Sequence, residues 1–285
     1  YSSVGSSIWI SAPGGEVGKH TNYFGAAAGV DVEPAIMTTD LQSCSKGYVN
    51  QYKYNSFNDS DAPHSENSSC NYTSVFNGTS AAAPVLSGVI ALMLEANSSL
   101  TWRDVKHILV STARQVDTSF NTISLNGVDY HKWITNSAGF KFHNYYGFGA
   151  VDAEAAVNAA LSYNANSLGT QNYLSWVSSG TLNAWVAEGA TRFNDIAVST
   201  TGTVEYVRIR LNFSHIRPTQ MGLRLMSPSG TVTTILQPFT SLDTNPGTGT
   251  SIYLAANAFY GESMAGNWRL YMYDHYTDYS QFYLG

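Results

Sequence analysis

One apolar segment constrains the fold of this chain more than any other feature. Residues 85–97 are nearly apolar on every side at helical spacing. A helix that is hydrophobic all round has to be buried inside a fold. The residues just before it, Ala81-Ala82-Ala83, have minimal side chains, which allow a helix to pack closely against a sheet. We therefore expect the chain to fold around a buried helix that ends near Asn97.

A serine lies at the start of this helix. With Thr79 or Ser80 at the helix start, the free N–H groups of the first turn and the positive end of the helix dipole face the same side as the serine hydroxyl. Gly78 permits a tight turn, and Pro84 is predicted to fall in the opening turn, where a missing N–H is tolerated. A serine nucleophile needs a held backbone, a base and oxyanion donors, and this stretch can supply the first and the third. An ordinary capped helix is the alternative, because Ser and Thr are common N-caps.

The composition indicates a globular chain with two domains. Of 285 residues, 44% are hydrophobic and only 12% are charged, which is enough material for two cores. The net charge of −6 and the scattered basic residues argue against a nucleic-acid partner. The longest uninterrupted apolar run is shorter than the roughly 20 residues of a membrane span, so we expect none. The chain opens without Met or a leader and stops within a strand-like run, so we interpret it as a fragment or a processed chain.

Two cysteines, Cys44 and Cys70, flank a polar stretch. A disulfide between them is favoured for a secreted protein, and two free thiols are the alternative. Residues 45–75 read as a surface loop with three acidic side chains, Asp59, Asp61 and Glu66. Such oxygens can bind Ca²⁺, but the spacing is not that of an EF-hand, and a solvated loop is the favoured interpretation.

The pattern changes in the second half of the chain. Thr101 and Asp104 form a capping box before one helix, and Asp152 caps another that runs to about Leu161. An Asn/Ser/Gly-rich stretch follows, and beyond it apolar residues alternate with polar ones as in β-strands. We predict three parts, with an antiparallel jelly-roll-like sandwich as the last: residues 1–162, a linker over 163–171, and residues 172–285.

Several segments carry a family resemblance. Residues 78–84, GTSAAAP, resemble the serine motif of subtilisin-like proteases, with Ser80 at the nucleophile position. The esterase elbow does not fit, because it requires glycine where Ala82 stands. The following segments are similar to the kexin and furin branch, the proprotein convertases, and to their secreted bacterial relatives: 38–41, 100–105 and 146–153, with 225–231 and 266–270 resembling the P domain of that branch. The resemblance implies the C-terminal part of an α/β subtilisin-like domain, followed by an all-β jelly-roll-like P domain.

The resemblance also implies a mechanism, that of a serine endopeptidase with a Ser-His-Asp triad. In that family the Asp and His motifs and the oxyanion Asn precede the serine, and here they would lie upstream of the first residue. None of the seven histidines has the flanking sequence of the family: His20, His64, His107, His131, His143, His215 and His275. We therefore expect Ser80 to be the one triad member in this chain, and the chain alone to be inactive. The alternative is a catalytically inactive subtilase-like protein with a binding or structural role.

Further expectations follow from the resemblance alone. They are cleavage of a protein or peptide substrate after basic residues, structural Ca²⁺ whose ligands the sequence does not identify, and a secreted, periplasmic or extracellular location. An N-terminal propeptide or a chaperone is the expected folding partner. The P domain is expected to stabilise the protease domain.

Overall fold

The structure is a computed structural model that describes residues 4–16, 35–51, 55–180, 186–213, 218–239 and 250–275. It divides into two compact units: Ala12–Ser98 forms one, and Ser3–Ser11 together with Ser99–Gly285 forms the other. We call them the serine unit and the large unit. The predicted division into residues 1–162, 163–171 and 172–285 rests on composition and on the spacing of apolar residues, whereas the two units are defined by contacts in the structure. The predicted division therefore stays a prediction.

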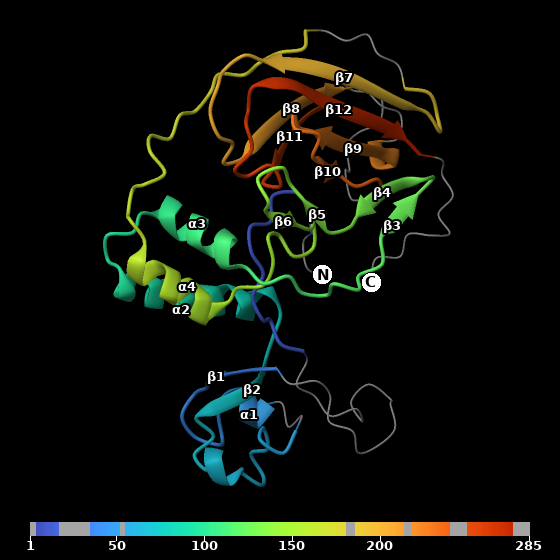
Figure 1. The fold of residues 1–285 in the computed structure, drawn as a ribbon. Helices are drawn as coiled ribbons and strands as arrows, with labels where there is room; N and C mark the ends of the chain where they lie inside the picture. The colour runs from blue at the N-terminus through green and yellow to red at the C-terminus, as the bar shows by residue number, and fades with distance from the viewer. Residues whose placement is uncertain are drawn as a thin grey trace. The chain divides into compact units, whose positions relative to one another are not determined.

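The serine unit contains one long helix and a small antiparallel sheet (Figure 1). Strand β1 (Ile36–Thr39) pairs with β2 (Tyr72–Phe76) in an antiparallel arrangement. The stretch expected to be a polar loop contains a short helix α1 (Gly47–Gln51) and a 3₁₀ turn η2 (Ser65–Asn67). Helix α2 (Thr79–Ala96) follows β2 directly.

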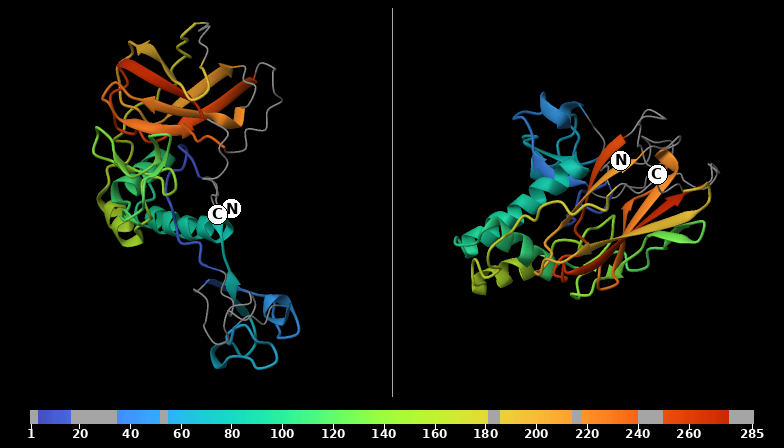
Figure 2. Two further views of the ribbon diagram at one scale, coloured as in Figure 1. Left: turned by 90° about the vertical axis from the view of Figure 1, so that its right-hand side faces the viewer. Right: turned by 90° about the horizontal axis from the view of Figure 1, so that it is seen from above.

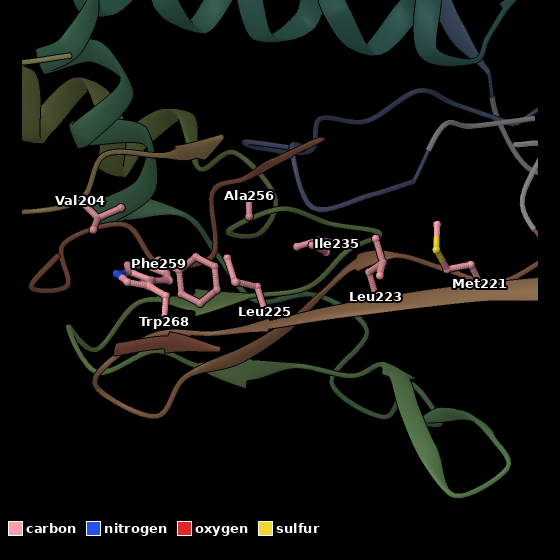
Figure 3. Packing of buried hydrophobic residues seen from close by; sticks show 8 residues of the cluster. All are labelled: Val204, Met221, Leu223, Leu225, Ile235, Ala256, Phe259 and Trp268. Atoms are coloured by element: carbon pink, nitrogen blue, oxygen red, sulfur yellow. The ribbon is translucent and has the colours of Figure 1, made fainter. Parts of the chain in front are cut away.

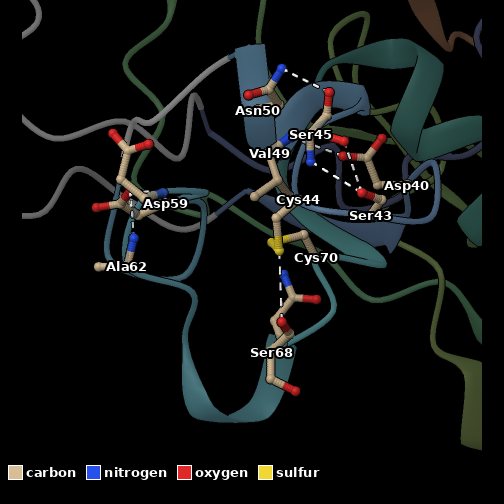
Figure 4. The surroundings of a disulfide bond; sticks show 12 residues. Asp40, Ser43, Cys44, Ser45, Val49, Asn50, Asp59, Ala62, Ser68 and Cys70 are labelled. Carbon is tan, nitrogen blue, oxygen red and sulfur yellow. Dashed lines mark hydrogen bonds between the residues drawn. A yellow bond between two sulfur atoms is a disulfide. The ribbon is translucent and has the colours of Figure 1, made fainter.

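A disulfide joins Cys44 and Cys70, as predicted, with their Cα atoms 4.9 Å apart (Figure 4). It closes a 26-residue separation that contains α1 and η2. Next to it, the Asp40 carboxylate accepts the N–H groups of Leu41 (2.8 Å) and Val49 (2.9 Å). The bridge and this carboxylate together hold a segment with few apolar side chains in a defined shape.

Helix α2 is less buried than its composition predicts. Its buried residues form a narrow stripe of Ala81, Val89 and Met93, whereas Leu92 and Leu94 are 51% and 39% exposed. The expectation of a fully buried helix is therefore wrong for the described residues, because packing covers one side of the helix only. Among these residues α2 is also the one helix long and apolar enough to cross a membrane, judged by length and composition. A count of uninterrupted apolar residues misses this, because Ser87 interrupts the run. The core helix of a soluble protein has the same composition.

The large unit contains helices α3 and α4, whose caps were predicted correctly. In helix α3 (Trp102–Thr112) the capping box is complete: Thr101 Oγ1 accepts the Asp104 N–H, and Asp104 Oδ2 accepts the Thr101 N–H at 2.8 Å. Asp152 caps α4 (Ala153–Ser162) by accepting the Ala155 N–H at 2.9 Å. Between these helices lie four short strands: β3 (Ile123–Leu125), β4 (Val128–His131), β5 (Ile134–Thr135) and β6 (Lys141–Phe142). Near the start of the chain, isolated β-bridges connect Ile10 with Gly147 and Ser11 with Ala150.

The second half of the large unit is an all-β sandwich (Figures 1 and 2). A four-stranded antiparallel sheet has the order β10-β9-β12-β7, and a two-stranded antiparallel sheet pairs β11 with β8. The strands are β7 (Thr191–Val198), β8 (Val207–Phe213), β9 (Met221–Met226), β10 (Val232–Leu236), β11 (Thr250–Ala256) and β12 (Gly266–Asp274), with a 3₁₀ turn η3 (Pro218–Gln220) before β9. Leu223, Leu225 and Trp268 belong to its core, and Ile209 of β8 packs against it (Figure 3). The predicted alternation is confirmed in β8 and β9, since every second residue of each of these strands belongs to this core or packs against it.

A second core joins the sandwich to the helical part of the large unit. Val110, Phe142 and Phe148 pack with Ala258 and Tyr260, which lie between β11 and β12. We call this contact, between residues 99–162 and residues 186–275, the seam. Hydrogen bonds reinforce the seam: the Asn136 amide donates to the carbonyls of Ala258 (2.9 Å) and Tyr260 (2.8 Å). The Asn144 amide donates to the Thr234 carbonyl (2.9 Å). Arg103 forms a bidentate ion pair with Glu205. Gly222 leaves room for the Tyr130 ring, because a Cβ there would lie 2.1 Å from the Tyr130 hydroxyl oxygen.

Candidate active site

Ser80 is the second residue of α2 and is exposed. The residue that caps this helix is Gly78, with φ 85° and ψ −168°, a combination that is essentially restricted to glycine. Its N–H donates to the Gly14 carbonyl at 2.7 Å, and a Cβ on Gly14 would lie 2.9 Å from the Gly78 carbonyl oxygen. Gly14 and Gly78, which are far apart in the sequence, therefore allow their two backbone segments to come into contact just before Ser80. This role of Gly14 was not predicted from the sequence, because nothing local distinguishes a turn glycine from one that lets a second backbone segment approach.

The first turn of α2 presents free donors beside Ser80. The Gly78 carbonyl accepts the N–H groups of Ala81 (2.9 Å) and Ala82 (3.1 Å). The N–H groups of Thr79 and Ser80 have no acceptor within the described part of the chain. Such donors at the positive end of a helix dipole stabilise a developing negative charge. These two N–H groups are therefore able to donate to an anionic oxygen placed beside Ser80.

The position of Pro84 differs from the prediction. It is the sixth residue of α2 and so lies beyond the opening turn. Proline has no N–H, so the Ser80 carbonyl, four residues earlier, receives no helical hydrogen bond from it. The expectation that Pro84 belongs to the first turn is therefore wrong. The helix lacks the backbone hydrogen bond that would end on the carbonyl of Ser80.

None of the histidines that the structure describes is bonded to Ser80, whose hydroxyl has no hydrogen-bond partner among these residues. In the serine unit, His64 Nδ1 accepts the Glu66 N–H at 3.3 Å and caps η2. The other four lie in the large unit and have their own partners: His107 bonds to Tyr260, His131 to Gln237, His143 to the Tyr145 N–H, and His275 to Tyr130. His20 and His215 lie outside the described residues. Each of these five histidines therefore has a hydrogen-bond partner other than Ser80.

Burial governs the charge of the large unit's histidines. It lowers the pKa values of His107, His131 and His275, and it lowers that of His143 from 6.5 to about 4. All four are held neutral at pH 7 by their surroundings, which suits side chains that form part of a packed interior.

The described acidic residues do not form a cation site. No group of three or more His, Cys, Asp or Glu side chains among them is arranged to hold a metal ion. In the loop considered for Ca²⁺, Asp59 Oδ1 instead accepts the N–H groups of Asp61 (2.9 Å) and Ala62 (3.3 Å) (Figure 4). No set of acidic ligands for the calcium expected from the family resemblance is identified among the described residues.

Comparison with known proteins identifies two family models along the chain. Residues 1–149 match the subtilase family, and residues 204–283 match the proprotein convertase P domain. An extracellular serine protease of Aeromonas sobria is 32% identical over 96% of this chain and 46% of its own length. A proprotein convertase subtilisin/kexin type 6 of Rattus norvegicus is 29% identical over 94% of this chain and 28% of its own length.

Solved structures agree with these matches. Two crystal structures of the Aeromonas sobria serine protease, one of them in complex with a chaperone, align with a TM-score of 0.75 at 30% identity. The alignment covers 96% of this chain and 48% of the solved chain. The chain thus spans less than half the length of each of these relatives.

Proposed function

The chain belongs to the subtilase family and carries a proprotein convertase P domain, and on that premise we propose that it forms part of a serine endopeptidase whose nucleophile is Ser80. The observation that supports this role is the position of Ser80. It is exposed in the first turn of α2, where the N–H groups of Thr79 and Ser80 have no acceptor among the described residues. It follows Gly78 by two residues, at the point where Gly14 and Gly78 approach each other closely.

The proposed reaction is acyl transfer. Ser80 Oγ attacks a peptide carbonyl and loses its proton to a histidine, and the oxyanion that forms is stabilised by N–H groups of the first turn. The leaving amine takes the proton back from the histidine, and water then releases the acyl group. Because Pro84 has no N–H to donate, the Ser80 carbonyl is not restrained by the usual helix hydrogen bond.

The histidine, the aspartate and the oxyanion asparagine are proposed to come from sequence outside this chain. Relatives of the chain are about twice its length, so there is room for them in a longer protein. The same additional sequence is proposed to cover the exposed side of α2 at Leu92 and Leu94, which makes α2 a core helix rather than a membrane span. This chain by itself is expected to be inactive.

Substrate, location and partners are proposed at the level that the relatives support. The matches include a proprotein convertase, which supports a protein or peptide substrate. Cleavage after basic residues is proposed from the family resemblance alone. An extracellular relative and the Cys44–Cys70 disulfide support secretion, since such bridges persist in oxidising compartments. One solved relative is in complex with a chaperone, which supports a propeptide or chaperone as folding partner. Structural Ca²⁺ remains an expectation for the longer protein.

Labelling with a fluorophosphonate probe tests the proposal, because only an activated serine reacts with it. The longer protein that contains this chain is expected to be labelled and to hydrolyse peptides, and both signals are expected to vanish in Ser80→Ala. This chain alone is expected to stay unlabelled. Ser87→Ala is the matched control, since Ser87 lies two turns further along the same helix and bonds to the Ala83 carbonyl (3.0 Å).

A second function has one observation in its favour, the lack of any described base bonded to Ser80. It is a catalytically inactive protein that acts through binding or as a structural element. Absence of labelling in the longer, folded protein would favour this second function over the protease.

A further inference from the structure

An exposed surface of aromatic and arginine side chains lies on the sandwich, on the outer side of the β11–β8 sheet. Its members are Tyr173, Trp176, Arg208, Arg210 and Tyr253, which we call the arginine–aromatic face. Tyr173, Trp176 and Tyr253 are 67%, 52% and 65% exposed, and both arginines are exposed as well. Exposed aromatic groups in such number mark an interaction surface more often than an inert one.

The alternation of strand β8 produces this face. Val207, Ile209 and Leu211 pack against the sandwich core, so Arg208 and Arg210 point outward. Tyr253 of β11 is paired directly with Arg210, and the Arg210 guanidinium carbon lies 5.5 Å from the centre of the Tyr253 ring. The outward positions of the two strands thus place cations and an aromatic ring side by side on a regular backbone.

An extended segment adds further rings to the same face. The Trp176 ring lies 6.2 Å from that of Tyr253 in an edge-to-face arrangement, and the Arg208 guanidinium carbon lies 5.3 Å from the centre of the Trp176 ring. Tyr173 lies beside Tyr206, whose pKa is raised first by burial and then by this neighbour. Residues 171–180, which carry Tyr173 and Trp176, include no charged side chain.

The charge of this face is uncompensated, in contrast to that of other arginines. Arg103 pairs with Glu205, and Arg269 pairs with Asp195 at 2.6 and 2.8 Å. Neither Arg208 nor Arg210 has an acidic partner among the described residues, and Arg210 bonds only to the Ser251 hydroxyl at 3.3 Å. The chain as a whole has a net charge of −6, so it does not attract anions in general. A local positive charge on one face therefore indicates that an anionic ligand binds at that face.

We propose that the arginine–aromatic face binds an anionic polysaccharide. The apolar C–H faces of sugar rings pack on exposed aromatic rings, and guanidinium groups bind sulfate or carboxylate oxygens in pairs. The face supplies both groups next to one another, on a rigid sheet. An acidic peptide would use the arginines but would leave the three rings without flat partners. The proposal does not depend on protease activity.

Binding of heparin oligosaccharides, followed by calorimetry on the whole chain, tests this proposal. Neutral dextran and dextran sulfate separate the contribution of charge, and poly-glutamate represents an acidic peptide. We expect binding to heparin and dextran sulfate but not to dextran, and weaker binding to poly-glutamate. Arg208→Ala and Arg210→Ala are each expected to weaken heparin binding about tenfold, the effect of losing one charge-assisted hydrogen-bonding group. Trp176→Ala is expected to weaken heparin binding and leave poly-glutamate binding unchanged.

Arg192→Ala is the matched control, because Arg192 is an exposed strand arginine on the other sheet. Its affinity is expected to equal that of the unaltered chain, and far-UV circular dichroism checks that each variant is folded. The proposal is overturned by an absence of heparin binding, by equal losses in Arg192→Ala and Arg208→Ala, or by poly-glutamate binding as tight as heparin. In the last case the ligand is an acidic peptide.

Discussion

At the scale of single residues, the backbone before Ser80 depends on the absence of side chains. Gly78 adopts dihedral angles that only glycine tolerates, and Gly14 approaches it too closely for a Cβ. These two positions direct the chain into α2 with the serine exposed. The position of the candidate nucleophile is thus set by two residues that carry no chemistry of their own.

Gly78→Ala is expected to lower the free energy of unfolding of the serine unit by about 1–3 kcal/mol, because alanine is strained in this backbone region. Gly88→Ala is the control within the same helix: a Cβ at Gly88 meets no atom within 4 Å, so the substitution is expected to raise stability by about 0.5–1 kcal/mol. Urea unfolding followed by circular dichroism measures both changes. A Gly78→Ala variant as stable as the unaltered chain would contradict the assigned backbone geometry.

At the scale of elements, the disulfide and the helix caps stabilise segments that bury little apolar surface. The loop closed by Cys44 and Cys70 contains α1 and η2, each shorter than two helical turns. Helices of this length do not persist alone, so their order depends on the covalent link and on side-chain caps such as Asp40. The capping box at Thr101 and Asp104 serves α3 in the same way.

Removing the disulfide is expected to cost about 3.5 kcal/mol of stability in the serine unit, from the loop-closure entropy of a 26-residue separation. The double substitution Cys44→Ser with Cys70→Ser, compared by urea unfolding with the unaltered chain, measures this loss. Adding a reductant to the unaltered chain should reproduce it and should leave the double variant unchanged. Equal stability of the oxidised and reduced chains would show that the loop is held by its other contacts.

Thr101→Ala is expected to destabilise the large unit by about 1 kcal/mol, the usual cost of losing an N-cap side chain. Asp104 is buried, and its Oδ2 also accepts the Thr101 hydroxyl at 2.7 Å and the Asn166 N–H at 3.1 Å. Thr101→Ser retains the hydroxyl and should restore most of the stability. Thermal unfolding of the three proteins provides the comparison, and a Ser variant no better than Ala would argue against the cap.

At the scale of the whole molecule, the seam joins helical and sandwich residues into one large unit. Its apolar core is shared, since Tyr260 from the sandwich packs with Phe142 and Phe148 from the other side. Neither half can bury these rings alone. We therefore propose a stabilising role for the P domain.

Ending the chain after residue 165 tests that role. The truncated chain is expected to expose Phe142, Phe148 and Val110 and to be recovered largely as insoluble protein, because an apolar patch of this kind promotes aggregation. Soluble yield and binding of a hydrophobic dye are the measurements. An equally soluble, well-folded truncated chain would contradict the stabilising role.

Acidification is expected to destabilise the large unit through His143. Its pKa is lowered from 6.5 to about 4, first by burial and then by His131, against an opposing effect of Asp117. The folded pKa lies below the unfolded one, so between pH 6.5 and 4 the unfolded chain binds the extra proton. The contribution of His143 to the free energy of unfolding is therefore full above pH 6.5, falls by about 3 kcal/mol as the pH decreases to about 4, and is constant below that. His131 contributes in the same direction.

The hydrogen bonds give the structural reason and the control. His143 Nδ1 accepts the Tyr145 N–H at 3.0 Å, so the neutral ring carries its proton on Nε2, and protonating Nδ1 would break this bond. His143→Asn keeps an acceptor and removes the titration, so its stability should vary less between pH 6.5 and 4. Urea unfolding at several pH values measures the slopes. An unchanged slope in the variant would assign the effect to other groups.

The sequence by itself determined the features that arise within a few residues of one another. The caps at Thr101 and Asp152, the alternation of the sandwich strands and the serine motif at the start of a helix were all predicted, because each depends on local hydrogen bonds or on the period of apolar residues. The family resemblance rests on the same local motifs. The disulfide was predicted as a pair, but only from the number of cysteines and the expected compartment.

Only the tertiary structure decided which distant residues meet. The approach of Gly14 to Gly78, the partners of the buried histidines and the one-sided packing of α2 depend on contacts between segments far apart in the chain. Such contacts leave no periodic signal, because the space beside a glycine or an imidazole is filled by whatever residue the fold brings there. For the same reason Ser80 could be proposed as a nucleophile from its sequence neighbours, whereas the contacts around it could not be predicted.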